Sequence, residues 1–132
     1  PIEIDGSKTM IYDYLKQINK EIQIYSDIFL TSRVTRVSHY GNVPLGVEKF
    51  SKPPYFVESI KIDAGNALIS ELENSQNTFL MIQNSQIDRE IGINIKTDNQ
   101  TKIVLKNGRL MPASYINEKF KLTPGDMVMF MR

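Results

Sequence analysis

The side chain best suited to acid–base catalysis is His39, the single histidine of the chain. An imidazole can serve as a general base near neutral pH, but it needs a partner that orients it. The sequence offers Asp27, Glu48 and Glu58, and none of them stands at a spacing typical of a catalytic pair. One histidine also cannot form a histidine-rich metal site. We therefore interpret His39 as a structural residue.

The remaining candidates for catalysis are equally weak. The chain has no cysteine, which excludes disulfides, cysteine-ligated zinc and a thiol nucleophile. The sequence contains no GxGxxG, Walker or HExxH motif, and its serines lack the context of a nucleophile elbow. Paired acids such as Glu71 with Glu73 are typical of a solvated surface. We expect a protein that is not an enzyme, with no catalytic residues, metal, cofactor or small-molecule substrate.

Positive charge is concentrated toward the C-terminal end. Residues 1–85 carry eight Lys/Arg against ten Asp/Glu, a net charge of −2, whereas residues 86–132 carry eight against five, a net charge of +3. This difference is compatible with a surface that binds a polyanion, although ordinary scatter of charges produces it as well. The net charge of the whole chain, +1, is low for a DNA-binding protein.

Four basic residues of this end are the candidate nucleic-acid contacts: Lys96, Lys102, Lys106 and Arg109. If segments 91–97 and 101–106 pair as a hairpin, the three lysines lie near one surface, and the arginine follows the next turn. A two-stranded ribbon of this kind can enter a DNA groove, with lysines on phosphates and an arginine on guanine. The alternative is an ordinary solvated face of a sheet.

The segment around the arginine resembles a known family. "NGRLMPASYINEKFKLTPGDMVMF", residues 107–130, resembles the swapped-hairpin domain of AbrB/SpoVT/MazE-type transcription regulators. The matching residues are Gly108-Arg109, Met111-Pro112, the segment 113–120, Leu122, Gly125-Asp126 and Val128 to Phe130. The resemblance implies an obligate homodimer that binds double-stranded DNA. Of the positions through which the family contacts DNA, this sequence matches only the one at Arg109. The proline stands one residue earlier than in the family pattern.

The candidate basic residues must be positioned by helices and strands. The helix that the sequence predicts most clearly spans Thr9 to Tyr25. Its apolar residues recur at steps of four and three and form one stripe. A single stripe either docks on a sheet or contacts another subunit. Together with the apolar strand at the end of the chain, it leads us to expect a homo-oligomer.

The rest of the pattern predicts mostly strands. Two short helices are expected at 64–75 and 113–120, and two turns at Asn107-Gly108 and at "TPGD". The fold class predicted is α+β: an N-terminal helix plus a mostly antiparallel sheet or small barrel with two short helices. The expected strands are 27–38, 55–63, 77–85, 91–98, 101–106 and 126–131.

Two of these strands leave an alternative open. Arg33 and Arg36 are three residues apart, so they point to opposite faces of a strand unless a bulge intervenes. Strand 126–131 alternates methionine with valine and phenylalanine, so both of its faces are apolar. It is either a central strand of the core or a strand shared with a second subunit.

Loop 39–56 is broken by glycines and prolines, yet it is rich in apolar residues. Such a loop is either packed or a binding arm. We expect one domain, 1–132, with the helix and a sheet in 1–85 and the swapped-hairpin-like unit in 86–132. No apolar run approaches the roughly 20 residues of a membrane span.

Two functions are therefore compatible with the sequence. The leading hypothesis is a DNA-binding regulatory protein that acts as an oligomer in the cytoplasm. The alternative is a non-enzymatic structural or adaptor protein, such as a component of a phage or virus particle, that works through protein–protein contacts. The second hypothesis would place the protein in a virion.

Overall fold

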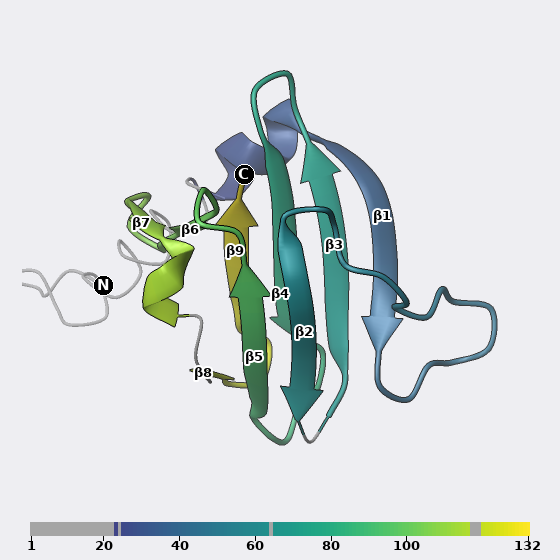
Figure 1. The fold of residues 1–132 in the computed structure, drawn as a ribbon. Helices are drawn as coiled ribbons and strands as arrows, with labels where there is room; N and C mark the ends of the chain where they lie inside the picture. The colour runs from purple at the N-terminus through teal and green to yellow at the C-terminus, as the bar shows by residue number, and fades with distance from the viewer. Residues whose placement is uncertain (1–22, 24, 64, 117–119) are drawn as a thin grey trace, which may run out of the picture.

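The computed structural model describes residues 23, 25–63, 65–116 and 120–132 (Figure 1). Within them, nine strands form two antiparallel sheets that pack face to face as a β-sandwich. The larger sheet has the strand order β1-β3-β4-β9-β6-β7 and the smaller one β2-β5-β8. The elements are β1 Arg33–Tyr40, β2 Val57–Asp63, β3 Ala67–Glu73, β4 Thr78–Asn84, β5 Ile91–Thr97, β6 Lys102–Val104, β7 Leu110–Pro112, the 3-10 helix η1 Ala113–Ile116, β8 Phe120–Leu122 and β9 Met127–Met131.

The predicted class, α+β with an N-terminal helix and two further helices, is wrong. The described chain is mostly antiparallel β, with a short helix at 25–31 ahead of β1. Residues 9–22 of the expected N-terminal helix lie outside the described residues. The helix expected at 64–75 is strand β3, and the one expected at 113–120 begins as the single 3-10 turn η1, with 117–119 outside the described residues.

Strand β3 resembles a helix in sequence because both of its faces are buried. It lies between β1 and β4, and Ala67 and Ile69 face the core while Leu72 packs on the opposite face. A strand that is buried on both sides loses the strict alternation of apolar and polar residues. Backbone pairing on both edges then overrides the weak helical pattern.

The main core fills the space between the two sheets. Ile93 of β5 and Ile62 of β2 belong to the same buried cluster as Ile69, Ile82 and Phe130 of the larger sheet. Each side chain of this size contributes about 1.5–3 kcal/mol when it is fully buried. The core therefore fixes how the two sheets, and the loops at their ends, lie relative to one another.

A second apolar cluster covers the outer face of the larger sheet. Met129 and Phe79 are buried there, with Tyr25 and Ile28 packed against the cluster. Strand β9 pairs with β4 on one edge and β6 on the other. The first explanation of the two-faced methionine strand, a central strand of the core, is therefore confirmed.

Both predicted turns are confirmed. Gly108 has a φ of +85° in the turn that joins β6 to β7, and Gly125 has a φ of +76° in the "TPGD" turn before β9. The hairpin considered for segments 91–97 and 101–106 is absent. Strand β5 pairs with β2 and β8, whereas β6 pairs with β7 and β9, so the chain passes from one sheet to the other between them.

Candidate functional site

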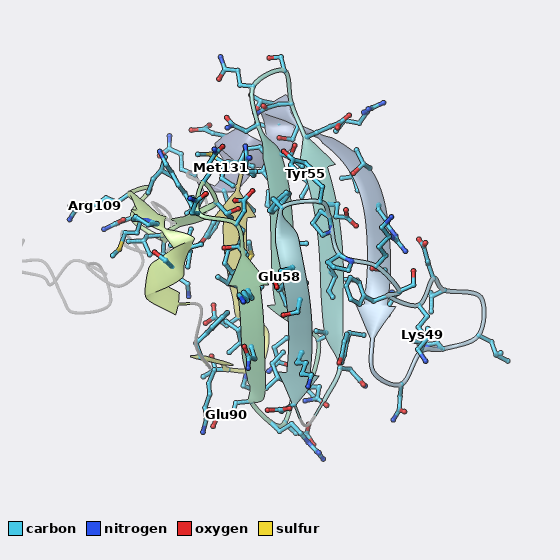
Figure 2. All side chains as sticks on the ribbon, in the orientation of Figure 1. Lys49, Tyr55, Glu58, Glu90, Arg109 and Met131 are labelled. Atoms are coloured by element: carbon cyan, nitrogen blue, oxygen red, sulfur yellow. The ribbon has the colours of Figure 1, made fainter. Side chains whose placement is uncertain are left out.

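The β6–β7 hairpin carries three of the four basic residues that the sequence predicts for nucleic-acid contact. Lys102 lies on β6, Lys106 lies in the turn, and Arg109 follows the turn. All three are exposed, and Arg109 points away from the sandwich (Figure 2). Lys96 lies on β5 of the smaller sheet, because β5 and β6 do not pair.

Two of these lysines form ion pairs. Nζ of Lys96 lies 3.4 Å from Oε2 of Glu58, and Nζ of Lys106 lies 2.7 Å from Oδ1 of Asp126. Exposed pairs add little stability, but each carboxylate offsets the positive potential of its lysine. Within the described residues, seven of the twelve lysines and arginines form ion pairs, and these pairs are spread over both sheets. Other pairs are Arg33 with Glu73, Arg36 with Glu48 and Lys121 with Glu90.

A β-bulge at Thr35 places Arg33 and Arg36 on the same face of β1. The β1–β3 register shifts by one residue between Val34 and Arg36, and the hydroxyl of Thr35 donates a 3.1 Å hydrogen bond to the carbonyl oxygen of Glu71. The extra residue restores the alternation that a spacing of three would otherwise break. The sequence allowed either a regular strand or a bulge between the two arginines, and the structure has the bulge.

Arg36 forms contacts that connect the loop after β1 to the edge of that strand. Its Nε lies 3.2 Å from Oε1 of Glu48, and its Nη2 donates a 2.9 Å hydrogen bond to the hydroxyl of Ser51. Burial raises the pKa of the neighbouring Glu71 above its ordinary value, and the charge of Arg36 opposes that rise. These contacts explain Arg36 as a structural residue that anchors a loop, whereas Arg33 pairs with Glu73 of the neighbouring strand β3.

The loop between β1 and β2 is closed at its base. The backbone amide of His39 donates to the carbonyl oxygen of Glu48 at 2.9 Å, and the amide of Phe50 donates to the carbonyl oxygen of His39 at 2.8 Å. The rings of Tyr40 and Phe50 pack with their centroids 6.0 Å apart. The segment 41–47 therefore leaves and rejoins the sandwich at one place, and it projects beyond the edge of the sheets (Figure 1).

The tip of this loop is apolar. The amide of Val47 donates to the carbonyl oxygen of Pro44 at 3.5 Å, and Gly46 has a φ of +85°. Glycine favours this geometry at the third position of a tight turn. The turn places Leu45 fully in solvent. The base of the loop is thus packed, as one interpretation of the sequence expects, while its tip has the form of an arm.

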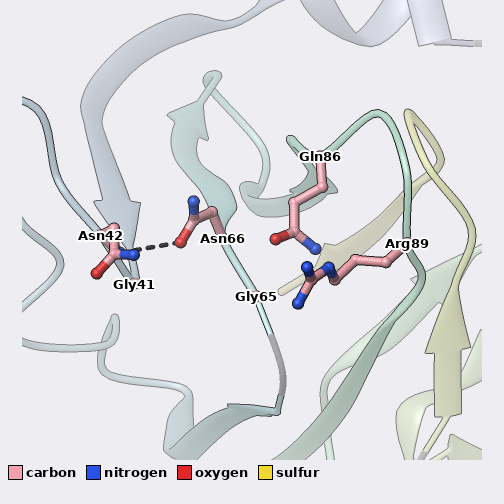
Figure 3. A pocket seen from close by; sticks show the side chains of 6 residues that line it. All are labelled: Gly41, Asn42, Gly65, Asn66, Gln86 and Arg89. Carbon is pink, nitrogen blue, oxygen red and sulfur yellow. Dashed lines mark hydrogen bonds between the residues drawn. The ribbon is translucent and has the colours of Figure 1, made fainter.

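A polar hollow of about 390 Å³ lies at the end of the sandwich where three loops meet (Figure 3). The first loop follows β1, the second joins β2 to β3, and the third follows β4. The backbone amide of Asn42 donates a 2.9 Å hydrogen bond to Oδ1 of Asn66, which joins the first two loops. The residues that line the hollow are Gly41, Asn42, Gly65, Asn66, Gln86 and Arg89.

Gln86 and Arg89 supply hydrogen-bond donors at the hollow. Nε2 of Gln86 is buried and has no hydrogen-bond partner among the described residues. Arg89 approaches a carboxylate only loosely, with its Nε 3.9 Å from Oδ1 of Asp88, and its side chain is largely exposed. Gln86 and Arg89 lie together on one side of the hollow, with Asn66 on the other (Figure 3).

The third loop is held by Asn84, the last residue of β4, which is 1% exposed. Its Nδ2 donates to the carbonyl oxygens of Arg89 and Leu122 at 2.9 and 3.0 Å, and its Oδ1 accepts from the amide of Gln86 at 2.9 Å. A buried amide whose donors and acceptor are all used rigidifies its surroundings. Asn84 therefore fixes both ends of the loop that carries Gln86 and Arg89.

Sequence reasoning did not find this hollow. Its polar side chains come from segments that are about 20 residues apart, and "DAGNA" contains too little glycine to indicate a phosphate-binding loop. The sequence does show many asparagine, glutamine and glycine residues at the strand ends that line the hollow. This composition is also typical of ordinary turns, so it does not indicate a site. Among the described residues, no group of three or more His, Cys, Asp or Glu is arranged to hold a metal ion.

Comparison with known proteins gives no family assignment: no family model, curated protein or solved structure matches this chain. The resemblance of residues 107–130 to AbrB-type domains therefore stays a prediction. None of the helices in the described part of the chain is long and apolar enough to cross a membrane.

Proposed function

We propose that this chain is a non-enzymatic structural or adaptor protein that acts through protein–protein contacts as a homo-oligomer, with loop 41–50 as a contact arm. The observation that carries the proposal is the exposure of Leu45 at the tip of an ordered turn. Burying such a side chain against a second subunit would contribute about 1.5–3 kcal/mol. Because the base of the loop is already closed, little conformational entropy is lost on binding.

The distribution of charge also supports this proposal. A regulator that grips DNA is expected to present one continuous basic surface. Seven of the twelve described lysines and arginines are instead paired with carboxylates, and the arm projects from the side of the sandwich that lies opposite Arg109 in Figure 2, where Lys49 marks the arm. Ion-paired surface charge and a projecting apolar arm are features that we expect of an adaptor protein.

Sedimentation velocity of the wild-type chain and of Leu45→Asp tests the proposal. We expect an oligomer for the wild type at tens of micromolar and a shift toward monomer for the variant, because a carboxylate cannot enter an apolar contact without a large desolvation cost. Leu30→Asp is the matched control, since Leu30 is also strongly exposed but lies beyond the other end of β1. A monomeric wild type, or equal dissociation by both variants, would overturn the proposal.

DNA binding is the second candidate function, and the β6–β7 hairpin is the observation that favours it. Lys102, Lys106 and Arg109 project from one short two-stranded ribbon at the edge of the larger sheet. Such a ribbon can place cations along a groove of double-stranded DNA. A titration with duplex DNA, argued in the Discussion, distinguishes the two functions.

A further inference from the structure

The polar hollow at the end of the sandwich has the size and lining of a site for one small polar group. Its volume of about 390 Å³ lies near the lower limit of ligand pockets in proteins, which is roughly 300 Å³. It is lined by side-chain amides, one guanidinium and two glycines, and no carboxylate or aromatic ring contributes to the described lining. A ligand here would therefore be recognised by hydrogen bonds and charge rather than by apolar contact or stacking.

Two residues of the lining, Gln86 and Arg89, present hydrogen-bond donors. The side-chain NH₂ of Gln86 is buried without an acceptor among the described residues, which leaves its desolvation uncompensated. Arg89 adds a positive charge, and Asp88 lies too far away to form a hydrogen bond with its Nε. An acceptor group that binds Arg89 would neutralise the guanidinium, and a rotation of the Gln86 side chain toward it would satisfy the buried NH₂.

Two glycines let the polar side chains of the hollow pack closely against the backbone. A Cβ on Gly65 would overlap the side-chain amide of Gln86, and a Cβ on Gly41 would overlap Oδ1 of Asn66 and lie 2.9 Å from the carbonyl oxygen of Gly65. The close approach of the β2–β3 loop to Gln86 therefore depends on the absence of a side chain at 65. The position of the unsatisfied amide is a consequence of this backbone geometry.

We propose that the hollow binds a carboxylate group, with Arg89 and Gln86 as the principal donors. A carboxylate is planar and carries one negative charge, so its two oxygens match a guanidinium and an adjacent amide NH₂. A phosphate dianion would leave one negative charge unbalanced in a lining that holds a single cation. The carboxylate can belong to a small free acid or to a protein side chain or terminus, since both present the same group.

The test is a ¹⁵N-resolved NMR titration of the full chain with acetate, glutarate, a short glutamate-containing peptide and inorganic phosphate, at ionic strength held constant with chloride. We expect a saturable shift of the Gln86 side-chain NH₂ signals. Arg89→Gln should weaken binding about ten-fold or more, the factor expected for one lost charged hydrogen bond. Arg33→Gln removes an arginine at the far end of β1, so it is the matched control and should leave the affinity unchanged.

Gly65→Ala supplies an independent variant. The added methyl group meets the flexible end of the Gln86 side chain, so the protein should stay folded while the amide is displaced and binding is lost. Tighter binding of the peptide than of the free acids would identify a protein carboxylate as the ligand, and the reverse would identify a small acid.

Three results would overturn the proposal. The first is the absence of a saturable shift up to about 50 mM acid, a concentration well above a millimolar dissociation constant. The second is an unchanged affinity of Arg89→Gln for the acids. The third is binding of phosphate as tight as that of the carboxylates. The outcome is independent of the proposed oligomer. Gly41 and Asn42 at the base of the arm line the hollow, but Leu45 at its tip does not, so Leu45→Asp should leave the titration unchanged.

Discussion

Nε of Arg132 donates a 2.9 Å hydrogen bond to Oδ2 of Asp98 and so joins the end of β9 to the connection between the two sheets. The other carboxylate oxygen of Asp98 accepts hydrogen bonds from the hydroxyl and the amide of Thr101, at 2.6 and 2.9 Å, and from the amide of Gln100 at 3.1 Å. The backbone of Arg132 pairs with Thr78 in β4 through two 2.8 Å bonds. One carboxylate thus shapes the crossover from β5 to β6 and ties it to the larger sheet.

The first prediction is that Asp98→Ala lowers the free energy of unfolding by about 1–2 kcal/mol at neutral pH, the usual cost of losing hydrogen bonds to a charged group. The hydrogen bond from Thr101, and then that from Arg132, lower the pKa of Asp98 below its ordinary value. The folded protein therefore binds this proton less readily than the unfolded chain. The contribution of the charge is complete above the ordinary aspartate pKa of about 3.9 and is lost as the pH falls through the lower folded pKa.

Urea unfolding of the wild type and the variant, at pH 7 and at successively lower pH, measures this difference. Asp88→Ala is the control, because the carboxylate of Asp88 is exposed and lies 3.9 Å from its arginine. That variant should change the free energy of unfolding by less than about 0.5 kcal/mol. A gap between wild type and Asp98→Ala that stays constant down to the lowest pH would show that the charge contributes nothing.

The second prediction compares Gly41→Ala with Gly46→Ala. Both glycines have positive φ, +102° and +85°, so alanine is strained at either position by roughly 1–2 kcal/mol. A Cβ at 41 would also overlap Oδ1 of Asn66, whereas at 46 it would meet nothing within 4 Å. Gly41→Ala should therefore lower the free energy of unfolding by about 1–2 kcal/mol more than Gly46→Ala. Equal losses in chemical denaturation would mean that the loops adjust freely at Gly41.

The third prediction concerns Asn84. Replacing it with alanine leaves the carbonyl oxygens of Arg89 and Leu122 and the amide of Gln86 without their side-chain partner. We expect a loss of about 2–4 kcal/mol in the free energy of unfolding. Asn94→Ala is the matched control, since Asn94 is exposed on β5, and it should cost less than about 0.5 kcal/mol. Faster exchange of the amides of 85–90 in Asn84→Ala would confirm that the side chain holds this loop.

Local patterns predicted the parts of the fold that depend on neighbouring residues. The Asn107-Gly108 and "TPGD" turns are set by the backbone preferences of two or three residues, and both are present. Apolar residues on both faces of β9 indicated a central strand as one of two alternatives, and the structure places it between β4 and β6.

Predictions that depended on distant partners failed or stayed open. β3 was read as a helix because its pattern reflects two neighbouring strands and two buried faces, which the segment 64–75 does not reveal by itself. The condition that would cluster the three lysines, a hairpin of 91–97 with 101–106, is not met, because each strand pairs elsewhere and Asp98 turns the chain between the sheets. The hollow combines Asn42, Asn66 and Gln86 from three loops, and no local window contains them together.

The last prediction tests DNA binding in the form that the hairpin supports. If duplex DNA is bound, Lys102→Ala and Lys106→Ala should weaken binding to all sequences alike and flatten the dependence of log K on log salt by about one unit each, because each lysine on a phosphate releases counterions. Arg109→Ala should cost about 1–3 kcal/mol if it contacts a base edge. Lys96→Ala should have the smallest effect, since Lys96 lies on the other sheet and is paired with Glu58.

Fluorescence anisotropy with random duplex at low salt measures these effects. Lys61→Ala is the control, because Lys61 is an exposed lysine on β2, away from the hairpin, and its removal should change neither affinity nor salt dependence. If all five variants weaken binding equally, the interaction depends on net charge and not on the hairpin. If the wild type does not bind at tens of micromolar, the DNA-binding hypothesis is wrong. The hairpin is then an edge of the larger sheet, where short strands, a proline at 112 and exposed charges keep other strands from pairing with it.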